Sequence, residues 1–337
     1  MSASPRPAHH RPDRGFRNPW PGTRVGGLGG MLRWMLERAA RGRVGFATRG
    51  TPPERVTATL PADRVQGGDC RVTWIGHSTF LLQVGGLNIL TDPVWGERAS
   101  PVSWAGPKRL VPPGLALGAL PPIDVVLQSH DHYDHFCDPT VRALARRHPE
   151  AHWLAPVGVG AQLRARGVAR ITECDWHDTV DLGGATATCV PARHFSGRSV
   201  TNRDHSLWCG WTLATPEVRV FFVGDTGRHP EFNDIGRRYG PFDVVLMPIG
   251  AYDPRWFMRP VHLDPEEAVE VFAESADPAR AVMVAMHWGT FVLTDEPVDE
   301  PPARARAAWR ARGFADERLW IMAPGESRLL TGSRGAR

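Results

Sequence analysis

The sequence predicts an α/β protein built as a four-layer αββα sandwich. Short apolar runs rich in β-branched residues recur along the 337-residue chain, and their length and composition indicate buried strands. Stretches with helical periodicity alternate with these runs in the middle and in the last third of the chain. Two strand-rich blocks accompanied by helices predict that sheet packs on sheet, with the helices on the outer faces.

The N-terminal segment has a composition of its own. Residues 1–30 are rich in Pro, Arg and Gly, so we expect a mobile or surface-draped arm that builds no core. Residues 31–41 predict a helix, because apolar residues recur at i, i+3, i+4, i+7 and i+8. Its apolar face is formed by Leu32, Met35, Leu36, Ala39 and Ala40. We favour packing of this helix on the rest of the chain, with a basic amphipathic helix at a membrane surface as the alternative.

A link containing Gly and Pro leads into the main part of the chain. We therefore divide the chain into an arm, residues 1–50, and a main domain, residues 51–337. The strands expected in this domain are 72–75, 79–84, 87–90, 123–128, 153–157, 171–174, 185–190, 207–213, 218–223, 244–249, 281–286 and 319–322. The expected helices are 140–147, 159–166, 265–276 and 302–312.

Composition narrows the class of protein. Hydrophobic residues make up 42% of the chain and charged residues 23%, which is typical of a globular protein. The net charge of +4 comes mainly from arginines scattered along the chain, so we expect no nucleic-acid binding. The five cysteines include no C-x-x-C pair, which argues for a reducing compartment. Without a signal-peptide pattern or a membrane-spanning run, we expect a cytoplasmic protein, either free or peripheral to a membrane.

A dense group of metal-binding donors lies between Ser129 and His135. These residues follow the expected strand 123–128 with the spacing H-x-H-x-D-H, and a helical pattern begins shortly after them at Asp138. Neutral imidazole nitrogens and a carboxylate are ligands that suit zinc, and a loop after a strand can turn several of them toward one point. The motif therefore predicts a metal site.

Three later donors each follow an apolar strand, namely His194, Asp225 and His287. A sandwich gathers the loops at its strand ends along one rim, so we expect these residues to share a site with the 129–135 motif. The donor count suggests two ions. One would be held by His130, His132 and His194, the other by Asp134, His135 and His287, and Asp225 would bridge them. Two metals about 3.5–4 Å apart can hold a bridging hydroxide and clamp a phosphoryl group.

Further residues have expected roles around these ligands. Asp134 could also accept a proton from the attacking water. His77, Asp92 and Asp131 are candidates for orienting the ligands through hydrogen bonds, and capping of turns explains them almost as well.

The motifs together resemble the metallo-β-lactamase superfamily, and more narrowly the family of N-acylphosphatidylethanolamine-hydrolysing phospholipases D. The resemblance covers about residues 16–330. Outside the metal ligands it rests on residues 16–21 (FRNPWP), 76–78 (GHS), 90–93 (LTDP), 106–109 (GPKR), 120–124 (LPPID), 224–227 (GDTG), 248–252 (PIGAY), 254–258 (PRWFM), 264–268 (DPEEA), 287–291 (HWGTF) and 325–328 (GESR).

This resemblance implies a metallo-β-lactamase-fold hydrolase domain in residues 51–337 with two zinc ions. It also implies a phospholipid substrate, cleaved to phosphatidic acid and an N-acylethanolamine. His262 would lie beside the substrate phosphate, either as a hydrogen-bond donor or as a proton source for the leaving alkoxide; a role at the entry of a helix is the alternative. An apolar acyl channel would be lined by Tyr252, Trp256, Phe257 and Met258, which core packing explains equally well.

Other outcomes stay open at this point. The same metal centre could hydrolyse a lactone or another ester, because only the attacked atom would differ. The same N/O donor set also accepts iron or manganese. A homodimer is a further expectation.

Overall fold

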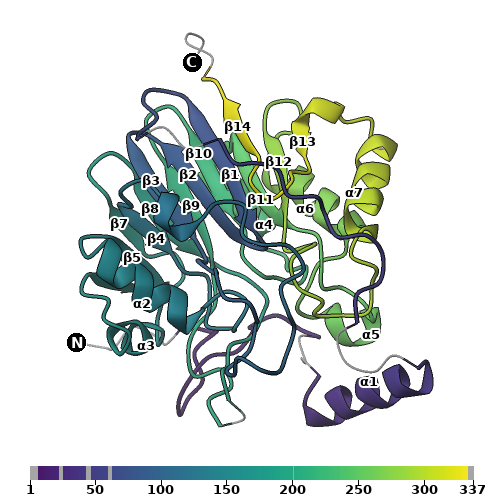
Figure 1. The fold of residues 1–337 in the computed structure, drawn as a ribbon. Helices are drawn as coiled ribbons and strands as arrows, with labels where there is room; N and C mark the ends of the chain where they lie inside the picture. Colours follow the sequence, from purple (N-terminus) through teal and green to yellow (C-terminus); the bar gives the residue numbers. More distant parts are fainter. Residues whose placement is uncertain (1–6, 23–25, 43–46, 60–62, 200, 333–337) are drawn as a thin grey trace.

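Two seven-stranded sheets packed face to face form the centre of the molecule, shown here as a computed structural model (Figure 1). The structure describes residues 7–22, 26–42, 47–59, 63–199 and 201–332. Helices cover the outer face of each sheet, so the predicted four-layer αββα architecture is confirmed.

The first sheet has the strand order β14-β1-β2-β3-β4-β5-β6. Its strands are β1 (Cys70–Gly76), β2 (Thr79–Val84), β3 (Leu87–Thr91), β4 (Val125–Leu127), β5 (His152–Pro156), β6 (Ile171–Cys174) and β14 (Ser327–Leu330). β1, β2 and β3 pair antiparallel, whereas β3 to β6 run parallel. Parallel pairing brings the carboxyl ends of β3 and β4 to the same edge of the sheet.

The second sheet has the order β13-β12-β11-β10-β9-β8-β7. Its strands are β7 (Thr179–Asp181), β8 (Thr186–Val190), β9 (Gly210–Ala214), β10 (Arg219–Phe222), β11 (Val244–Pro248), β12 (Val282–Met286) and β13 (Leu319–Trp320). β10 to β13 run parallel. β8 and β10 are both antiparallel to β9, so their carboxyl ends also point the same way.

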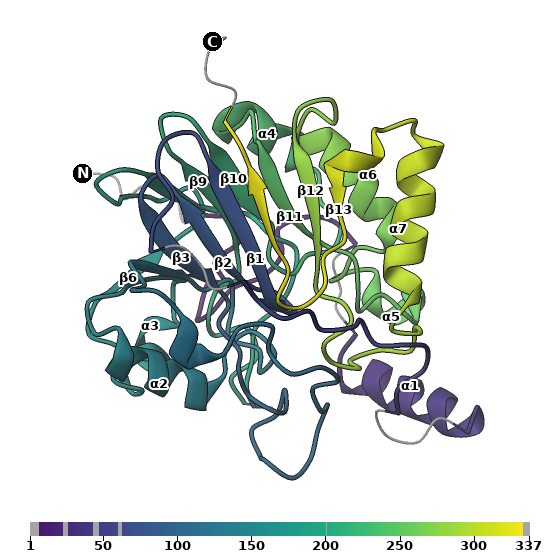
Figure 2. The same ribbon diagram turned by 45° about the horizontal axis from the view of Figure 1, so that its top comes forward.

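The helices form the two outer layers (Figure 2). α2 (Asp138–Arg147) and α3 (Gly160–Arg164) pack on the first sheet, and α4 (Phe232–Tyr239), α6 (Pro265–Ser275) and α7 (Glu300–Ala311) cover the second. The remaining helical elements are α1 (Leu28–Ala40), α5 (Arg255–Met258) and the 3₁₀ turns η1 (Leu117–Ala119) and η2 (Asp316–Arg318). Among the described residues, no helix combines the length and apolar character needed to cross a bilayer.

Successive side chains of a strand point to opposite faces of the sheet, so they pack in different layers. Trp74, Phe80 and Leu82 belong to the large core between the sheets. Their neighbours Ile75 and Leu81 face the opposite way, into the cluster under α2 and α3. Because both faces of these strands are buried, the strands read in the sequence as continuous apolar runs.

The N-terminal arm lies against the main domain in its described part. The Nε2 atoms of His9 and His10 contact the two carboxylate oxygens of Asp175 at 2.6 and 2.7 Å. Phe16 is buried in the large core, so the expectation that the arm builds no core is wrong at this residue. The division of the chain at residue 50 stays a prediction.

The orientation of α1 differs from the prediction. Five residues of its expected packing face are instead exposed, namely Leu32, Met35, Leu36, Ala39 and Ala40. The side that faces the domain carries Trp34, which is buried against Phe257 and Met258. Trp34 Nε1 also donates a hydrogen bond to Asp295, and Arg38 forms an ion pair with the same carboxylate. Packing through the apolar stripe was therefore the wrong expectation, because one aromatic ring and one buried carboxylate fix the orientation.

Besides the 3₁₀ turns η1 and η2, four elements are absent from the prediction: β7, β14, α4 and α5. β7 and β14 are three and four residues long and only partly buried, and α5 has four residues. Segments this short offer too few positions for a periodic pattern. α4 spans eight residues but buries only Phe232 and Ile235, so its apolar face is narrow.

Candidate metal centre

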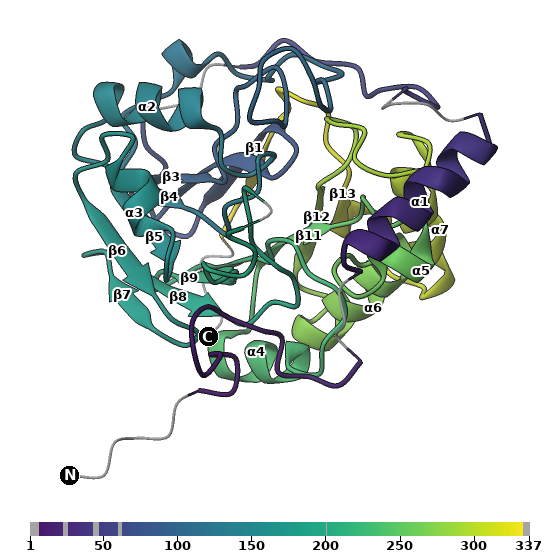
Figure 3. The same ribbon diagram turned by 90° about the horizontal axis from the view of Figure 1, so that it is seen from below.

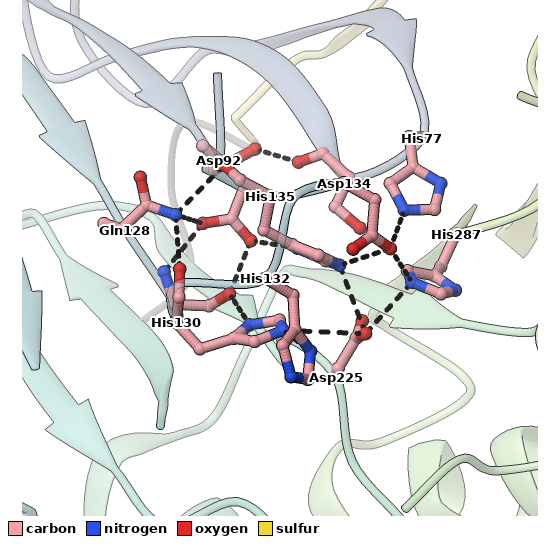
Figure 4. A network of polar contacts seen from close by, with 12 residues as sticks. His77, Asp92, Gln128, His130, His132, Asp134, His135, Asp225 and His287 are labelled. Atoms are coloured by element: carbon pink, nitrogen blue, oxygen red, sulfur yellow. Dashed lines mark hydrogen bonds and ion pairs between the residues drawn. The ribbon is translucent and has the colours of Figure 1, made fainter. Parts of the chain in front are cut away.

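The donor side chains lie on loops that follow the strands of both sheets. In the first sheet, Asp92 follows β3 and His130 follows β4. In the second sheet, His194 follows β8, Asp225 follows β10 and His287 follows β12. The carboxyl ends of these strands meet at one rim of the sandwich, so residues distant in sequence become neighbours there (Figure 4).

Three histidines form the first group of donors. His132 Nδ1 lies 2.9 Å from His130 Nε2 and 3.2 Å from His194 Nε2. Tetrahedral zinc with Zn–N bonds of about 2.1 Å separates neighbouring ligand atoms by about 3.4 Å, which these nitrogens approach. The backbone carbonyl of Val261 lies 3.0 Å from His194 Nδ1 and leaves Nε2 directed at the group. These three histidines are the set that the sequence assigns to one metal.

The second group contains the three residues assigned to the other metal and one more. Asp134 Oδ2 lies 3.4 Å from His135 Nε2 and 3.5 Å from His287 Nε2. It lies nearer still to His77 Nε2, at 2.9 Å. All four residues offer a donor atom within 4.8 Å of the others. His77, which the sequence suggests only as an orienting residue, is thus also placed to be a ligand.

Asp225 lies between the two groups, as a bridging carboxylate would. Its Oδ2 is 3.0 Å from His287 Nε2 and 3.1 Å from His135 Nε2. The same oxygen is 3.8 Å from His194 Nε2 and 4.0 Å from His130 Nε2. One carboxylate oxygen therefore faces imidazoles of both groups.

Glycine is required just before this carboxylate. Gly224 has φ +67°, and a Cβ there would lie 2.7 Å from the carbonyl oxygen of Cys209. The turn that directs Asp225 into the site is therefore open only to glycine.

Several buried donor atoms in the centre lack a hydrogen-bond partner among the described residues. They are Asp225 Oδ1 and the Nε2 atoms of His135 and His287, which contact Asp225 Oδ2 at 3.1 and 3.0 Å as ion pairs without hydrogen-bond geometry. An unsatisfied buried polar atom costs about 1–3 kcal/mol, a penalty that a cation among them would remove. Imidazole and carboxylate donors suit zinc, and also iron or manganese. The residues therefore fit a metal site.

The pKa values of the centre also favour cation binding. Burial lowers the pKa of His130 and of His194 well below 6.5, so both rings are neutral, the form that binds metals. Burial lowers the pKa of His287 too, but the carboxylates of Asp225 and Asp134 outweigh it and raise that pKa to about 9. The carboxylates thus draw positive charge, as a proton or a metal ion, into this half of the centre.

A buried network orients the ligands from behind. Asp92 Oδ2 accepts a hydrogen bond from His135 Nδ1 at 2.6 Å and from Ser129 Oγ at 2.5 Å. Ser129 Oγ also lies 2.9 Å from His130 Nδ1. Gln128 Nε2 donates to Asp92 Oδ1 at 3.0 Å and to the carbonyls of His130 and His135 at 2.8 and 3.0 Å. The sequence did not single out Ser129 and Gln128, although an amide that closes an apolar strand was an available signal.

Backbone strain is concentrated at this centre. His77, Asp92 and His287 have φ values of 55°, 31° and 62°, in the left-handed region that non-glycine residues rarely adopt. Such conformations persist where the surrounding contacts hold them, and they cluster at functional sites.

Asp131 makes different contacts from its expected ones. Its Oδ1 accepts a hydrogen bond from the Gly197 amide at 2.9 Å, and its Oδ2 from Gln162 Nε2 and Ser206 Oγ at 2.8 Å each. None of these partners is a metal-donor side chain. Asp131 therefore tethers the surrounding loops to the metal loop instead of orienting an imidazole.

His262 lies at the edge of the centre. Its ring centroid is 5.1 Å from that of His194 and 5.3 Å from that of His287. Its Nδ1 is buried without a hydrogen-bond partner among the described residues. The ring is therefore close enough to act on a group bound at the donor cluster.

The four residues expected to line an acyl channel have other contacts in the structure. Tyr252 is buried, and its hydroxyl donates to Glu300 at 2.6 Å. Phe257 and Met258 pack on Trp34 of α1, whereas Trp256 is exposed. Their role in substrate binding stays a prediction.

Comparisons with known proteins find a matching family and several relatives. The Beta-lactamase superfamily domain matches residues 87–288. An uncharacterized protein of Mycobacterium tuberculosis is 47% identical over 254 residues, which make up 74% of this chain and 67% of that protein. The N-acyl-phosphatidylethanolamine-hydrolyzing phospholipase D 1 of Caenorhabditis elegans is 38% identical over 272 residues, 76% of each chain.

Two further matches come from archaea. A UPF0173 metal-dependent hydrolase of Methanopyrus kandleri is 30% identical over 262 residues, 76% of this chain and 98% of that protein. The solved structure of Igni18, a metallo hydrolase from Ignicoccus hospitalis, covers 78% of this chain and 99% of its own, with a TM-score of 0.58 and 23% identity. The latter is a likeness of fold. The family match spans more than half of the chain, and from it and these relatives we conclude that the chain belongs to the beta-lactamase superfamily and is a metal-dependent hydrolase.

Proposed function

We propose that the protein is a dinuclear zinc phosphodiesterase that hydrolyses N-acylphosphatidylethanolamine-type phospholipids to phosphatidic acid and N-acylethanolamine. The observation that carries the proposal is the position of Asp225 Oδ2, within 3.0–4.0 Å of imidazoles from both donor groups. The substrate class is supported by the Caenorhabditis elegans relative and by a yeast relative that is 31% identical, both named for this hydrolysis.

The two donor groups would each hold one zinc ion. The first would use His130, His132 and His194; the second would use Asp134, His135 and His287, with Asp225 shared. When bound, two ions supply Lewis-acid stabilisation of phosphoryl oxygens and a water of lowered pKa as nucleophile.

Asp134 is suited first to holding a metal. Burial raises the pKa of its carboxyl, but the charge of His135 and the contacts with the imidazoles of His287 and His77 outweigh this and lower the pKa well below 3.8. A carboxylate with so low a pKa is a good anionic ligand and a weak base. The hydrogen bond from His77 Nε2 at 2.9 Å keeps it oriented. Acceptance of a proton from the attacking water is therefore the lesser of its two expected roles.

His262 is suited to the leaving group. Hydrolysis breaks the bond between phosphorus and the ethanolamine oxygen, and the departing alkoxide must take up a proton. The buried Nδ1 of His262, which has no hydrogen-bond partner among the described residues, can donate a hydrogen bond to a phosphoryl oxygen in its neutral N–H form. Burial lowers the pKa of His262 to about 3, so the ring is neutral near pH 7. To act as the general acid for the alkoxide, it would first have to take up a proton from water as negative charge develops beside it.

The test is a direct assay of the purified 337-residue chain reconstituted with zinc. Given N-acylphosphatidylethanolamine in detergent micelles, the protein should release N-acylethanolamine and phosphatidic acid, measured by mass spectrometry. Asp225→Asn, which keeps the size of the side chain but removes its charge, should reduce the rate by at least about 100-fold. Hydrolysis of a lactone and ester panel without release of N-acylethanolamine would replace this proposal with the esterase alternative.

A further inference from the structure

A second group of metal-binding side chains lies outside the metal centre, where the N-terminal arm meets the main domain. It consists of His9 and His10 of the arm and Asp175 in the loop after β6, and we call these three residues the arm site. Each imidazole directs its Nε2 at a different carboxylate oxygen, at 2.6 Å from Oδ1 for His9 and at 2.7 Å from Oδ2 for His10. Two imidazoles and one carboxylate are a ligand set that is typical of zinc sites with an open position.

The arm presents the two histidines from a small hairpin. His10 and Phe16 form an antiparallel bridge. The Arg17 amide donates a hydrogen bond to the His9 carbonyl at 2.8 Å. The His9 ring stacks on Trp176 with centroids 4.2 Å apart, and the Phe16 ring packs edge-on against the His10 ring at 4.9 Å. Both imidazoles are therefore held in position before an ion binds, which reduces the entropy that binding costs.

The domain fixes the position and the charge of the carboxylate. Asp175 Oδ1 accepts a hydrogen bond from the Trp176 amide at 2.8 Å, and the Asp175 amide donates to Asp178 Oδ2 at 2.8 Å. Burial raises the pKa of Asp175, but hydrogen bonds from His9 and from the Trp176 amide, with the charge of His9, outweigh it and lower that pKa to about 2. Asp175 is therefore an anion at neutral pH, as a metal ligand must be.

This anion has no permanently charged counterpart. Among the described residues, Asp175 forms ion pairs with the two imidazoles and with no arginine or lysine. The side chains of His9, His10 and Asp175 are 9%, 27% and 24% exposed, so an ion can enter from solvent and keep water as a further ligand. A divalent cation among these atoms would neutralise the carboxylate and use both imidazoles in their neutral form.

We infer that the arm site binds a zinc ion, and that this ion fastens the N-terminal arm to the domain. The present separations of 2.6 and 2.7 Å are those of hydrogen bonds. Ligand atoms around tetrahedral zinc lie about 3.4 Å apart, so each imidazole nitrogen would have to withdraw from the carboxylate by about 0.7–0.8 Å. A rotation of roughly 15° about the Cα–Cβ bond of a histidine moves Nε2 this far and stays within one rotamer well.

The arm connects this site to the metal centre. Figure 3 shows the purple segment that follows the hairpin passing beside α4, where Trp20 Nε1 donates to Glu231 Oε1 at 3.0 Å. Between the hairpin and Trp20, Asn18 Nδ2 donates to the backbone carbonyl of His194 at 2.8 Å. An ion at the arm site would therefore hold in place a segment that supports one histidine of the first donor group. The inference does not depend on which substrate the metal centre hydrolyses.

Equilibrium dialysis against a range of free zinc concentrations measures the ion directly, without any turnover. The wild-type chain should take up about one zinc equivalent more than His10→Ala, which lacks an imidazole, or Asp175→Asn, which lacks the negative charge. The matched control is His205→Ala, which removes an exposed histidine that is not among these donors. It should bind zinc like wild type. Equal zinc content in all four proteins at every concentration would overturn the inference.

Hydrogen exchange tests whether the ion joins the arm to the domain. The Phe16 amide donates to the Asp204 carbonyl at 2.8 Å, so it exchanges when the arm opens. With the metal centre already loaded, free zinc at about 100 times the dissociation constant of the arm site should slow this exchange about 100-fold in the wild type. His10→Ala should show no such effect.

Two results of the exchange measurement would contradict the inference. Uptake of the additional zinc equivalent without slower exchange of the Phe16 amide would place that ion away from the contact between arm and domain. Slower exchange on acidification, with no effect of zinc, would assign the positive charge to protons on the two imidazoles.

Discussion

At the scale of single residues, the centre separates ligands from residues that could act on the substrate. Each histidine of the first donor group directs one ring nitrogen inward. The other ring nitrogen, Nδ1, lies near the Val261 carbonyl in His194 and near Ser129 Oγ in His130. His262 differs, because its Nδ1 is buried and without a partner among the described residues. This difference predicts that its removal affects turnover and leaves the metals in place.

We expect His262→Ala to retain two zinc ions per chain while turnover of the phospholipid falls roughly 10²–10⁴-fold, the usual effect of losing a general acid or a phosphoryl hydrogen bond. Elemental analysis and a rate measurement on the same preparation test both statements. Loss of one zinc equivalent would make His262 a ligand, a possibility raised by its place in a cluster with His194 and Asp225.

At the scale of elements, the N-terminal arm is fastened to α4 through a buried histidine. The Trp20 ring stacks on His229 with centroids 4.5 Å apart, and the His229 ring lies 3.9 Å from that of Phe232. Burial, with a smaller contribution from the nearby Arg193 charge, lowers the pKa of His229 to about 3. The folded protein therefore keeps this ring neutral, whereas the unfolded chain protonates it near pH 6.5.

Because the folded-state pKa is the lower one, His229 contributes stability that is present above about pH 6.5 and is lost as the pH falls toward 3. Between about pH 7.5 and about pH 5.5, the wild type should lose about 1 kcal/mol of unfolding free energy that His229→Gln does not lose. Urea unfolding of the two metal-loaded proteins at both pH values measures this difference. Equal pH slopes would show that His229 is accessible to protons in the folded state.

At the scale of the whole molecule, the metal centre joins the two sheets. His130, His132, Asp134 and His135 follow β4 of the first sheet, whereas His194, Asp225 and His287 follow strands of the second. Carboxylates lie buried where these loops meet, beside imidazole nitrogens that have no hydrogen-bond partner among the described residues. A cation at this junction would therefore stabilise the packing of one half of the sandwich on the other.

Removing metal with a chelator should lower the melting temperature by about 6 °C. This follows from a stabilisation of about 4 kcal/mol when the ion is present at 1,000 times its dissociation constant, divided by an unfolding entropy of roughly 0.7 kcal/mol per kelvin for a chain of this size. Differential scanning calorimetry before and after chelation, and after zinc is restored, provides the measurement. An unchanged melting temperature in protein shown to be metal-free would mean that the donor cluster is stable without ions.

The sequence predicted most of the fold because the buried strands and long helices are marked by local patterns. Runs such as Val244–Pro248 and Val282–Met286 are apolar throughout, since both faces of each strand are covered. The short elements β7, β14 and α5 show no such local pattern in the sequence. Their positions are set by neighbours distant in the sequence, as in the pairing of β14 with β1.

The donor residues of the metal centre were also predictable, but the residues that hydrogen-bond to these donors were predicted only in part. The H-x-H-x-D-H spacing from His130 to His135 and the three strand-end donors can be recognised in the sequence, because few residue types can bind a metal. The network of Ser129, Gln128 and Asp92 depends on hydrogen-bond geometry across two strands. Periodicity does not encode such contacts.

The sequence by itself thus determined the sandwich, the donor residues and the amphipathic character of α1, because each depends on residue type and short-range spacing. Tertiary structure decided three other matters. It placed Asp225 between the donor groups, brought His77 against Asp134, and turned the apolar face of α1 outward. The physical reason is the same in each case. Loops from different sheets must come together before the Asp225 carboxylate can face both donor groups. Likewise, Trp34 and Asp295, which are far apart in the sequence, must come together before their hydrogen bond can orient α1.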